Sequence, residues 1–461
     1  MSDTTSTIDQ KERTDFTEGS VWASIIKMGL PSMFGFLGQH FYSLINTFWV
    51  SKLSAGENAI AAITFFINMM FVFFSINHLI GPGSVAVISR RYGEKDYDKA
   101  EKAIKETIVL KLFFGVIFSA LGLYFLRDAL RFVGAQGETL ELAVAYGAIF
   151  MAGMPIMFAT YSLFTAMRGV ANPKMAMILM FGSTILNAIL DPILMFGWLG
   201  LPALGIRGAA IASVVSFSLA FVIGLYLFFF DYTNVRLHIK GKERMSLDSM
   251  WILIRIGIPS WLGEMSFSLS RLLITPLIAH FGNAVVAAFG IGMQVFGLGI
   301  AILVGIGLGL SSLIGHTVGS GKLDRAKVTA DKAIAFGVVV MAVLGVFIAI
   351  WVRPILGIFF SDPVAIEAGV TYLRTIAFSF PFFGALFMIE SIHGGVGLNT
   401  PVMVVSVLQA WVLQVLPVLV AVQYFAVGQV VVWWIMALSG VISSIGFYWY
   451  YRQGRWLTVS V

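Results

Sequence analysis

The stretch Leu186-Asn187-Ala188-Ile189-Leu190-Asp191-Pro192 lies inside a run that is otherwise almost wholly apolar, from residue 175 to residue 196. A carboxylate at membrane depth costs about 2.5–3.5 kcal/mol on insertion scales, so it usually faces a polar cavity or a partner. Asn187 precedes Asp191 by four residues and shares its helical face, and Pro192 frees a nearby carbonyl. The stretch predicts an intramembrane site for a proton or a small hard cation. The alternative is a structural Asp held by hydrogen bonds.

The composition indicates a membrane protein. Of the 461 residues, 58% are hydrophobic and 12% are charged, whereas soluble domains carry about 25% charged residues. A helix needs about 20 apolar residues to cross a bilayer, so the chain has room for about a dozen such helices. Cys is absent, which excludes disulfides, thiolate-bound zinc and iron–sulfur clusters. We expect an all-α membrane protein with no cofactor and no nucleic-acid partner.

Long apolar runs predict twelve membrane-spanning helices in two groups of six, with a polar break between the groups. The first group is expected at 24–50, 59–81, 104–126, 139–163, 175–197 and 207–230. The second group is expected at 250–273, 284–310, 331–352, 368–390, 402–422 and 427–450.

Lysine and arginine are distributed unevenly over the two ends of these helices. With twelve spans, 22 of them fall on the side that holds both termini and the loop at 231–249, and 6 fall on the other side. The positive-inside rule places the richer side in the cytoplasm. Residues 1–20 are polar and lack the apolar core of a signal peptide. We expect a multi-pass protein of the cell (inner, cytoplasmic) membrane with both termini in the cytoplasm.

The two groups of helices are repeats of each other. The stretch Ile-Lys-Met-Gly-Leu-Pro-Ser at 26–32 recurs as Ile-Arg-Ile-Gly-Ile-Pro-Ser at 254–260, and Tyr146 and Pro155 recur as Tyr372 and Pro381. Each half has an even number of helices, so the halves are parallel repeats about an axis along the membrane normal. Two such bundles with a cavity between them favour an alternating-access transporter.

The repeat divides the chain into five parts. A cytoplasmic tail at 1–23 precedes an N-lobe at 24–230 with helices 1–6, and a cytoplasmic linker at 231–249 leads to a C-lobe at 250–450 with helices 7–12. A second cytoplasmic tail follows at 451–461. We expect the two lobes to form a V with a central cavity, in a monomer surrounded by membrane lipids.

Other polar residues inside the predicted helices are candidates for substrate or proton binding. His40 follows Gln39 in the first helix and is expected to line the cavity. Glu264 precedes Arg271 by seven residues, which is two turns along one helical face. We expect Glu264 to bind a cationic substrate or the coupling proton, with Arg271 adjusting its charge state; the alternative is a structural pair. Glu390, near the cytoplasmic end of the tenth helix, is a further candidate.

Several stretches resemble the sequence patterns of the multidrug and toxic compound extrusion (MATE) family, part of the multidrug/oligosaccharidyl-lipid/polysaccharide superfamily. Gln39 with Asn46-Thr47 is similar to the family's first-helix pattern Gln…Asp-Thr. The loop Arg-Gly-Val-Ala-Asn-Pro-Lys at 168–174 resembles Arg-Gly-x-Gly-Asn-Pro-Lys, and residues 186–192 match the fifth-helix motif. Residues 205–213 resemble the entry into the sixth helix, with Ser213 where close relatives often have Thr. The likeness covers nearly the whole chain.

The resemblance implies a cation-coupled exporter in which Asp191, Asn187 and Ser213 line a cation site in the N-lobe. The family's first-helix Asp is Asn46 here, and an Asn can offer an oxygen to a metal cation but cannot take up a proton. Either coupling rests on Asp191 and the C-lobe, or the protein uses a reduced or different site, or its substrate needs no such Asp. With Asp191 and Asn187 as ligands, Na⁺ is a candidate coupling ion beside H⁺.

The sequence thus predicts a secondary antiporter rather than an enzyme. It would export small organic cations or drugs in exchange for H⁺ or Na⁺ by alternating access, with Asp191 as the coupling carboxylate. An alternative within the same superfamily is a flippase for a lipid or a lipid-linked oligosaccharide. An embedded enzyme or a receptor is a further alternative, although the chain has no His-Glu-x-x-His or Gly-x-Ser-x-Gly motif.

Overall fold

The first half of the chain folds into seven α-helices. A computed structural model describes residues 14–53, 56–360, 362–425 and 427–459, and within these ranges it contains no strand. Local caps set several helix starts: the Asp96 side chain accepts a hydrogen bond from the Lys99 N–H, and Pro173 stands in a first turn, where a backbone donor is not needed. The helices are α1 (Val21–Val50), α2 (Gly56–Phe74), α3 (Ile76–Gly93), α4 (Tyr97–Phe132), α5 (Gly137–Gly169), α6 (Pro173–Phe196) and α7 (Ile206–Phe229).

The second half begins with a capped helix and repeats the helical pattern. The Ser246 side chain accepts from the Ser249 N–H at the start of α8, at 3.3 Å. The helices are α8 (Leu247–Ala279), α9 (Asn283–Gly319), α10 (Leu323–Gly357), α11 (Pro363–Val396), α12 (Thr400–Val407), α13 (Leu416–Tyr424) and α14 (Gln429–Arg452). The short helices η1 (Trp198–Gly200), η2 (Leu408–Val415) and η3 (Arg455–Thr458) complete the described chain.

Each of the twelve predicted spans corresponds to a helix or to a closely linked set of helices. Ten helices among the described residues are long and apolar enough to cross a membrane. The second predicted span, which is divided between α2 and α3, and the seventh, α8, are the two outside that set. Several helices are longer than predicted: α4 begins at Tyr97 instead of residue 104, because its first two turns are charged and extend beyond the apolar run.

Two spans contain interruptions that the apolar pattern did not predict. Between α2 and α3 the chain turns at Ser75, whose carbonyl accepts from the His78 N–H at 2.9 Å. Between α12 and α13 lies η2, a π-helical segment in which the Leu416 N–H bonds to the Trp411 carbonyl, five residues back. Pro417 follows directly and has no backbone donor. Such irregular backbone at membrane depth is tolerated only inside protein or beside a cavity.

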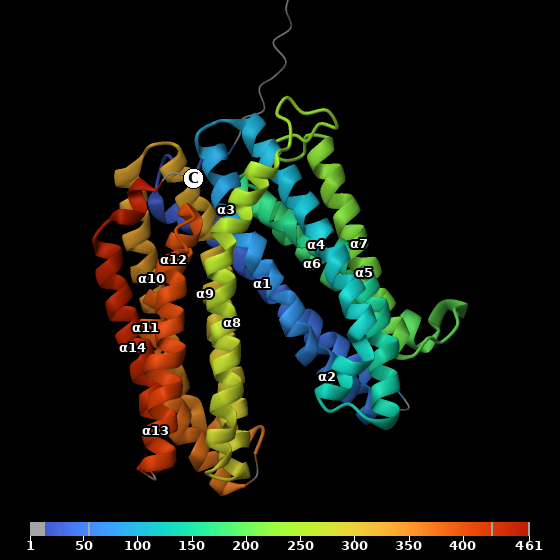
Figure 1. The fold of residues 1–461 in the computed structure, drawn as a ribbon, viewed down its shortest axis with the longest axis vertical. Helices are drawn as coiled ribbons and strands as arrows, with labels where there is room; N and C mark the ends of the chain where they lie inside the picture. Colours follow the sequence, from blue (N-terminus) through green and yellow to red (C-terminus); the bar gives the residue numbers. More distant parts are fainter. Residues whose placement is uncertain (1–13, 54–55, 361, 426, 460–461) are drawn as a thin grey trace, which may run out of the picture.

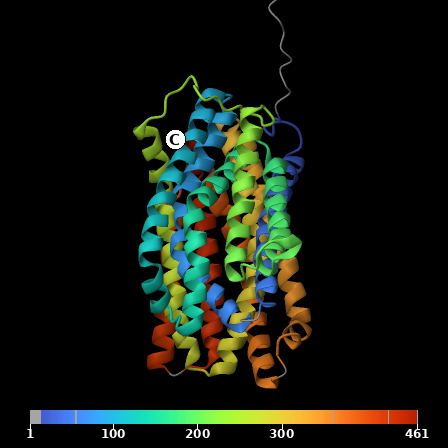
Figure 2. The same ribbon diagram turned by 90° about the vertical axis from the view of Figure 1, so that its right-hand side faces the viewer.

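The helices form two bundles that lie close together at one end and diverge toward the other (Figure 1). Helices α2 and α4–α7 make the right-hand bundle and α8–α14 the left-hand bundle, while α1 crosses obliquely between them and α3 lies between the bundles near the end where they meet. The turn between α3 and α4 and the segment 230–246 lie at the end where the bundles meet, which we call the basic end. Figure 2 shows the same segment passing over this end, with most helices running along the long axis.

Glycines bring the two lobes together near the basic end. Helix α1 packs against α9, and α3 packs against α8 and α9. A Cβ at Gly257 of α8 would overlap the carbonyl of Leu79 in α3, and a Cβ at Gly309 of α9 would overlap the carbonyl of Met28 in α1. Any side chain at these glycines would push the helices apart. The lobes are therefore in contact at the basic end in this conformation.

The segment 14–20, which we call the N-terminal strap, fastens the same end. The Arg325 guanidinium at the start of α10 donates to the carbonyls of Gly19 at 2.8 Å and Glu18 at 2.9 Å. His316 of α9 forms a hydrogen bond between Nε2 and the carbonyl of Gly169, at the end of α5, at 2.6 Å. These contacts hold the C-lobe against the strap and against the N-lobe.

The segment 230–246 that joins the lobes is bonded to the N-lobe. Buried Glu101 of α4 accepts from the His238 backbone N–H at 2.7 Å and contacts its ring Nδ1 at 3.0 Å. Buried Glu106, one and a half turns further along α4, accepts from the Ser246 N–H at 3.0 Å. Asn234 donates to the carbonyl of Val170 at 2.9 Å. The connection is therefore anchored along its length and is not a loose tether.

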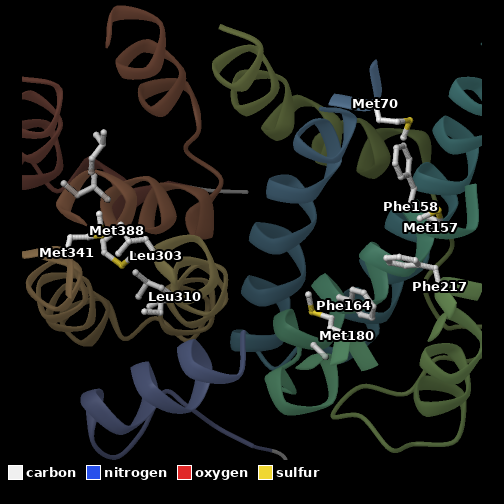
Figure 3. Close-up of a cluster of buried hydrophobic side chains, with 14 of the residues drawn as sticks. Met70, Met157, Phe158, Phe164, Met180, Phe217, Leu303, Leu310, Met341 and Met388 are labelled. Carbon is white, nitrogen blue, oxygen red and sulfur yellow. The ribbon is translucent and has the colours of Figure 1, made fainter. Parts of the chain in front are cut away.

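Methionine and aromatic side chains fill the core of each lobe. Figure 3 shows two groups of labelled core residues, one with Phe158 and Met180 in the N-lobe and one with Leu303 and Met341 in the C-lobe. Phe158, Leu303 and Met341 have no exposed surface. Close-packed interiors resist continuous deformation, so each lobe is suited to move largely as a unit.

Candidate functional site

Asp191 lies in α6, near the end of the helix that is remote from the basic end. Its side chain has no exposed surface. The Asn187 side chain, one turn back on α6, donates to Oδ1 at 3.3 Å, and the Asn46 side chain on α1 donates to Oδ2 at 3.4 Å. The carboxylate is thus held by two neutral amides, one from each helix, and among the described residues no salt bridge joins it to a basic side chain.

The two amides can also serve a bound cation. Asn187 Oδ1 is buried and has no hydrogen-bond partner among the described residues. A half-turn of an Asn side-chain amide exchanges its nitrogen and oxygen positions, so each amide can donate to a bare carboxylate or offer an oxygen to a cation. In the described part of the chain no three acidic or histidine side chains gather. A cation here would be held by one carboxylate with amide and hydroxyl oxygens, a donor set that suits Na⁺.

Two tyrosines that the sequence did not single out as site residues extend this group. The Tyr42 hydroxyl on α1 lies 2.6 Å from the Ser213 hydroxyl on α7, and Ser213 in turn donates to the Ala209 carbonyl at 2.9 Å. Tyr146 of α5 is buried beside Ser213, and Asp191 lies within electrostatic range of both tyrosines. The predicted residues Asn46, Asp191 and Ser213 are therefore brought together, with Tyr42 and Tyr146 around them.

Of the two substrate or proton candidates in the first helix, Gln39 and His40, the structure describes the side chain of Gln39 alone. Gln39 is half-buried and lies near the Tyr161 side chain of α5. The Tyr161 ring packs on Phe217 at 5.7 Å between centroids, and Tyr42 packs on the same ring at 6.3 Å. Gln39 thus borders the Asp191 group through aromatic neighbours. The side chain of His40 lies outside the described part of the structure.

A second polar cluster lies where α3 and α4 of the N-lobe approach α8 and α11 of the C-lobe. Glu264 of α8 is exposed, and its charge acts on Glu390 of α11 and on His78 of α3. Lys111 of α4, which also acts on His78, is buried and donates to the side chain of Asn77. Glu264 and Glu390, which the sequence offered as separate candidates, are therefore within electrostatic range of each other, and Glu264 is also in range of His78 in the other lobe.

The structure describes the side chains of both Arg271 and Glu264 and records no direct ion pair between them, the pair that the sequence offered as an alternative. Within the described residues, no ion pair is recorded for either side chain, and Arg271 lines a cavity inside the C-lobe.

The loop at 168–174 has a structural role that its sequence did not reveal. Asn172 Oδ1 accepts from the Asn234 N–H at 2.8 Å, so this loop anchors the segment that joins the two lobes.

The sequence pattern of the MatE family matches residues 31–193 and again residues 259–420. The chain belongs to the MatE family. The two matches fall on the two lobes, as the internal repeat requires. This membership makes the protein a multi-pass membrane transporter and not an enzyme.

Several named proteins are similar to this MatE chain over most of its length. The probable multidrug resistance protein YoeA of Bacillus subtilis is 26% identical over 94% of each chain. The multidrug export protein MepA of Staphylococcus aureus (strain MRSA252) is 26% identical over 88% of each chain. A FAD transporter of Shewanella oneidensis is 26% identical over 77% of this chain and 78% of its own.

Solved structures share the fold. A transporter of the MOP superfamily from Pyrococcus furiosus superposes with a TM-score of 0.88 and 24% identity, over 98% of this chain and 100% of the other. A MATE family transporter in an outward-facing conformation gives the same TM-score, identity and coverage. These likenesses confirm the predicted all-helical fold of two six-span bundles.

Proposed function

We propose that the protein is a secondary active antiporter that exports small organic cations, drugs among them, in exchange for H⁺ or Na⁺. The observation that carries the proposal is Asp191, a fully buried carboxylate whose partners among the described residues are two neutral amides. An uncompensated buried charge is costly, so binding of a cation at Asp191 changes the stability of its surroundings. The multidrug relatives in Bacillus and Staphylococcus support drugs as substrates.

Orientation follows from charge. The basic end carries most of the lysine and arginine of the loops, so the positive-inside rule places it in the cytoplasm. The lobes touch at that end and diverge at the other (Figure 1), which makes this conformation the outward-facing one. Alternating access then requires the contacts at the basic end to break so that substrate can enter from the cytoplasm or the inner leaflet.

Helix α1 supplies the connection between Asp191 and those contacts. Asn46, near one end of α1, donates to Asp191. Met28, near the other end of the same helix, packs against Gly309 of α9 in the C-lobe. Neutralising Asp191 weakens the hydrogen bond that Asn46 donates to it, and any resulting shift of α1 reaches the contact between the lobes. A cation drives the change only if it binds the two conformations with different affinity.

The substrate is expected to meet acidic groups of the C-lobe. Glu264 is exposed and Glu390 is partly exposed, and neither is recorded in an ion pair within the described residues. Two carboxylates near each other attract a positively charged ligand. The transporter acts as a monomer in contact with membrane lipids, needs no cofactor and engages no nucleic acid.

Purified protein in liposomes tests the proposal. Ethidium transport driven by a pH gradient or by a Na⁺ gradient is measured at clamped membrane potential, which names the coupling ion. D191N should abolish uphill transport, whereas D128N, at an exposed carboxylate on α4, should leave it unchanged. Full uphill transport by D191N refutes Asp191 as the coupling group. Gradient-independent movement of lipid without ethidium transport indicates a flippase instead.

A further inference from the structure

The C-lobe contains a cavity that the coupling mechanism does not use. It has a volume of about 100 Å³, is partly open, and is lined by residues of α8, α9, α11, η2 and α14. Helices α8, α9, α11 and α14 belong to the left-hand bundle of Figure 1. Five of its thirteen lining residues are aromatic: Phe267, Phe289, Phe296, Tyr372 and Phe383. A closed cavity of roughly 150 Å³ lined by apolar side chains holds one benzene molecule, so this smaller, partly open cavity has room for no more than a single ring.

The cavity carries a positive charge. Arg271 of α8 lines it, and the side chain is exposed. Within the described residues its guanidinium has no recorded ion pair or hydrogen bond. Arg271 stands eight residues before the end of α8 at Ala279, which is roughly 12 Å along the helix. An arginine at this depth without a protein partner is costly and therefore marks a functional site.

An amide without partners lies in the same wall. Gln409 is 1% exposed, and neither its Oε1 nor its Nε2 has a hydrogen-bond partner among the described residues. It belongs to η2, the π-helical segment, which also supplies Gln414 to the wall. Single π-helical turns occur frequently at functional sites. A buried amide that is left unsatisfied costs free energy, and a ligand with a polar substituent would recover it.

We propose that this cavity is a binding site for a small aromatic carboxylate. The guanidinium of Arg271 receives the carboxylate through two parallel hydrogen bonds, a geometry that suits arginine and not lysine. The ring packs edge to face among the aromatic walls. Gln409 bonds a polar substituent on the ring. Because its only charge is positive, the cavity disfavours organic cations, so this site is distinct from Asp191 and from the pair Glu264 and Glu390.

Binding of benzoate to the purified full-length chain in nanodiscs, measured by isothermal titration calorimetry, tests the proposal. Benzyl alcohol and benzylammonium share the ring but not the negative charge, and both should bind at least tenfold more weakly than benzoate. R271Q should weaken benzoate at least tenfold, since it removes a charge-assisted pair. R271K keeps the positive charge but cannot form two parallel hydrogen bonds, so it should weaken benzoate binding less than R271Q does.

The matched control is R374Q. Arg374 lies on α11, is exposed, donates to the carbonyl of Ala349 and does not line the cavity, so this variant should bind benzoate like the parent. Equal benzoate affinity in R271Q and the parent, absence of benzoate binding to the parent, or equally tight benzylammonium binding each overturns the proposal. If R271Q does not fold, the R271K variant tests the proposal instead, and benzoate affinity equal to that of the parent in R271K overturns it too. Ethidium transport, measured in parallel, reports on the proposed antiport independently.

Discussion

The close contact at Gly257 should control how often the lobes open at the basic end. A Cβ at this position would overlap the carbonyl of Leu79 in α3, so G257A must push α8 away from α3. Overpacking of this kind costs roughly 1–3 kcal/mol. The cost falls on the conformation in which the lobes touch and disappears in the one in which they part. The greater helix propensity of Ala acts on both conformations and cancels.

A cost of this size predicts a measurable shift between the two conformations. A difference of about 1–3 kcal/mol changes the ratio of open to closed molecules by roughly five- to 150-fold. The expected direction is toward the conformation that is open at the basic end. Loss of uphill transport should follow, because a transporter that rests in one conformation completes fewer cycles.

The chain offers a clean background for the assay because it has no cysteine. Ser89 of α3 is fully buried and lies against Gly315 of α9, so S89C places a single thiol in the contact between lobes. Its rate of labelling by a membrane-impermeant maleimide, added at the basic end, reports the open population. The labelling rate of S89C/G257A should exceed that of S89C alone by the same roughly five- to 150-fold.

A matched glycine provides the control. A Cβ at Gly290 of α9 would meet no heavy atom within 4 Å, so G290A adds the same methyl group and the same helix propensity without a clash. It should leave the labelling rate unchanged. The reasoning is refuted if G257A labels no faster than G290A, because Gly257 would then not limit the approach of the two lobes.

Three further predictions concern other contacts. N46D places a second carboxylate about 3.4 Å from Asp191, and two such groups cannot both stay ionised. We therefore expect reversal-potential measurements to give more protons per substrate, and an unchanged stoichiometry would contradict this. R325Q removes the donors to Glu18 and Gly19, so a spin label on the N-terminal strap should become more mobile, whereas unchanged mobility would show that other contacts hold it. F158A empties a fully buried position and should destabilise the protein by about 3–5 kcal/mol, seen as a lower melting temperature, while F378A, at an exposed ring, should have a smaller effect; equal losses would argue against the core packing described.

Sequence periodicity and internal repetition were sufficient to predict the helices and the two lobes. Asn187 and Asp191 are one turn apart on one helix, so their contact was also predictable from spacing alone. The family resemblance made Asn46 a candidate for the cation site, but it specified no contact between Asn46 and Asp191. By contrast, the contact of Tyr42 with Ser213 joins residues 171 positions apart, and no local pattern specifies such a distance.

The expected link between Glu264 and Arg271 shows a second limit of sequence reasoning. Spacing of seven residues correctly places both on one face of α8, but a face two turns long can border two different environments. Glu264 lies close to Glu390 of α11, whereas Arg271 lines the C-lobe cavity. The interruptions at Ser75 and in η2 also escaped prediction, because the few polar residues there leave the predicted spans predominantly apolar.

The hydrogen bonds of Glu101 and Glu106 to the segment 230–246 have a consequence for how the polypeptide can be divided. Each side of a cut near residue 240 would retain an anchor on α4, through His238 on one side and Ser246 on the other. Two separately expressed fragments could then reassemble into a working transporter, because non-covalent bonds already perform the task of the peptide connection. A covalent link between the two halves would then not be required for the folded structure, and each lobe could be isotopically labelled by itself.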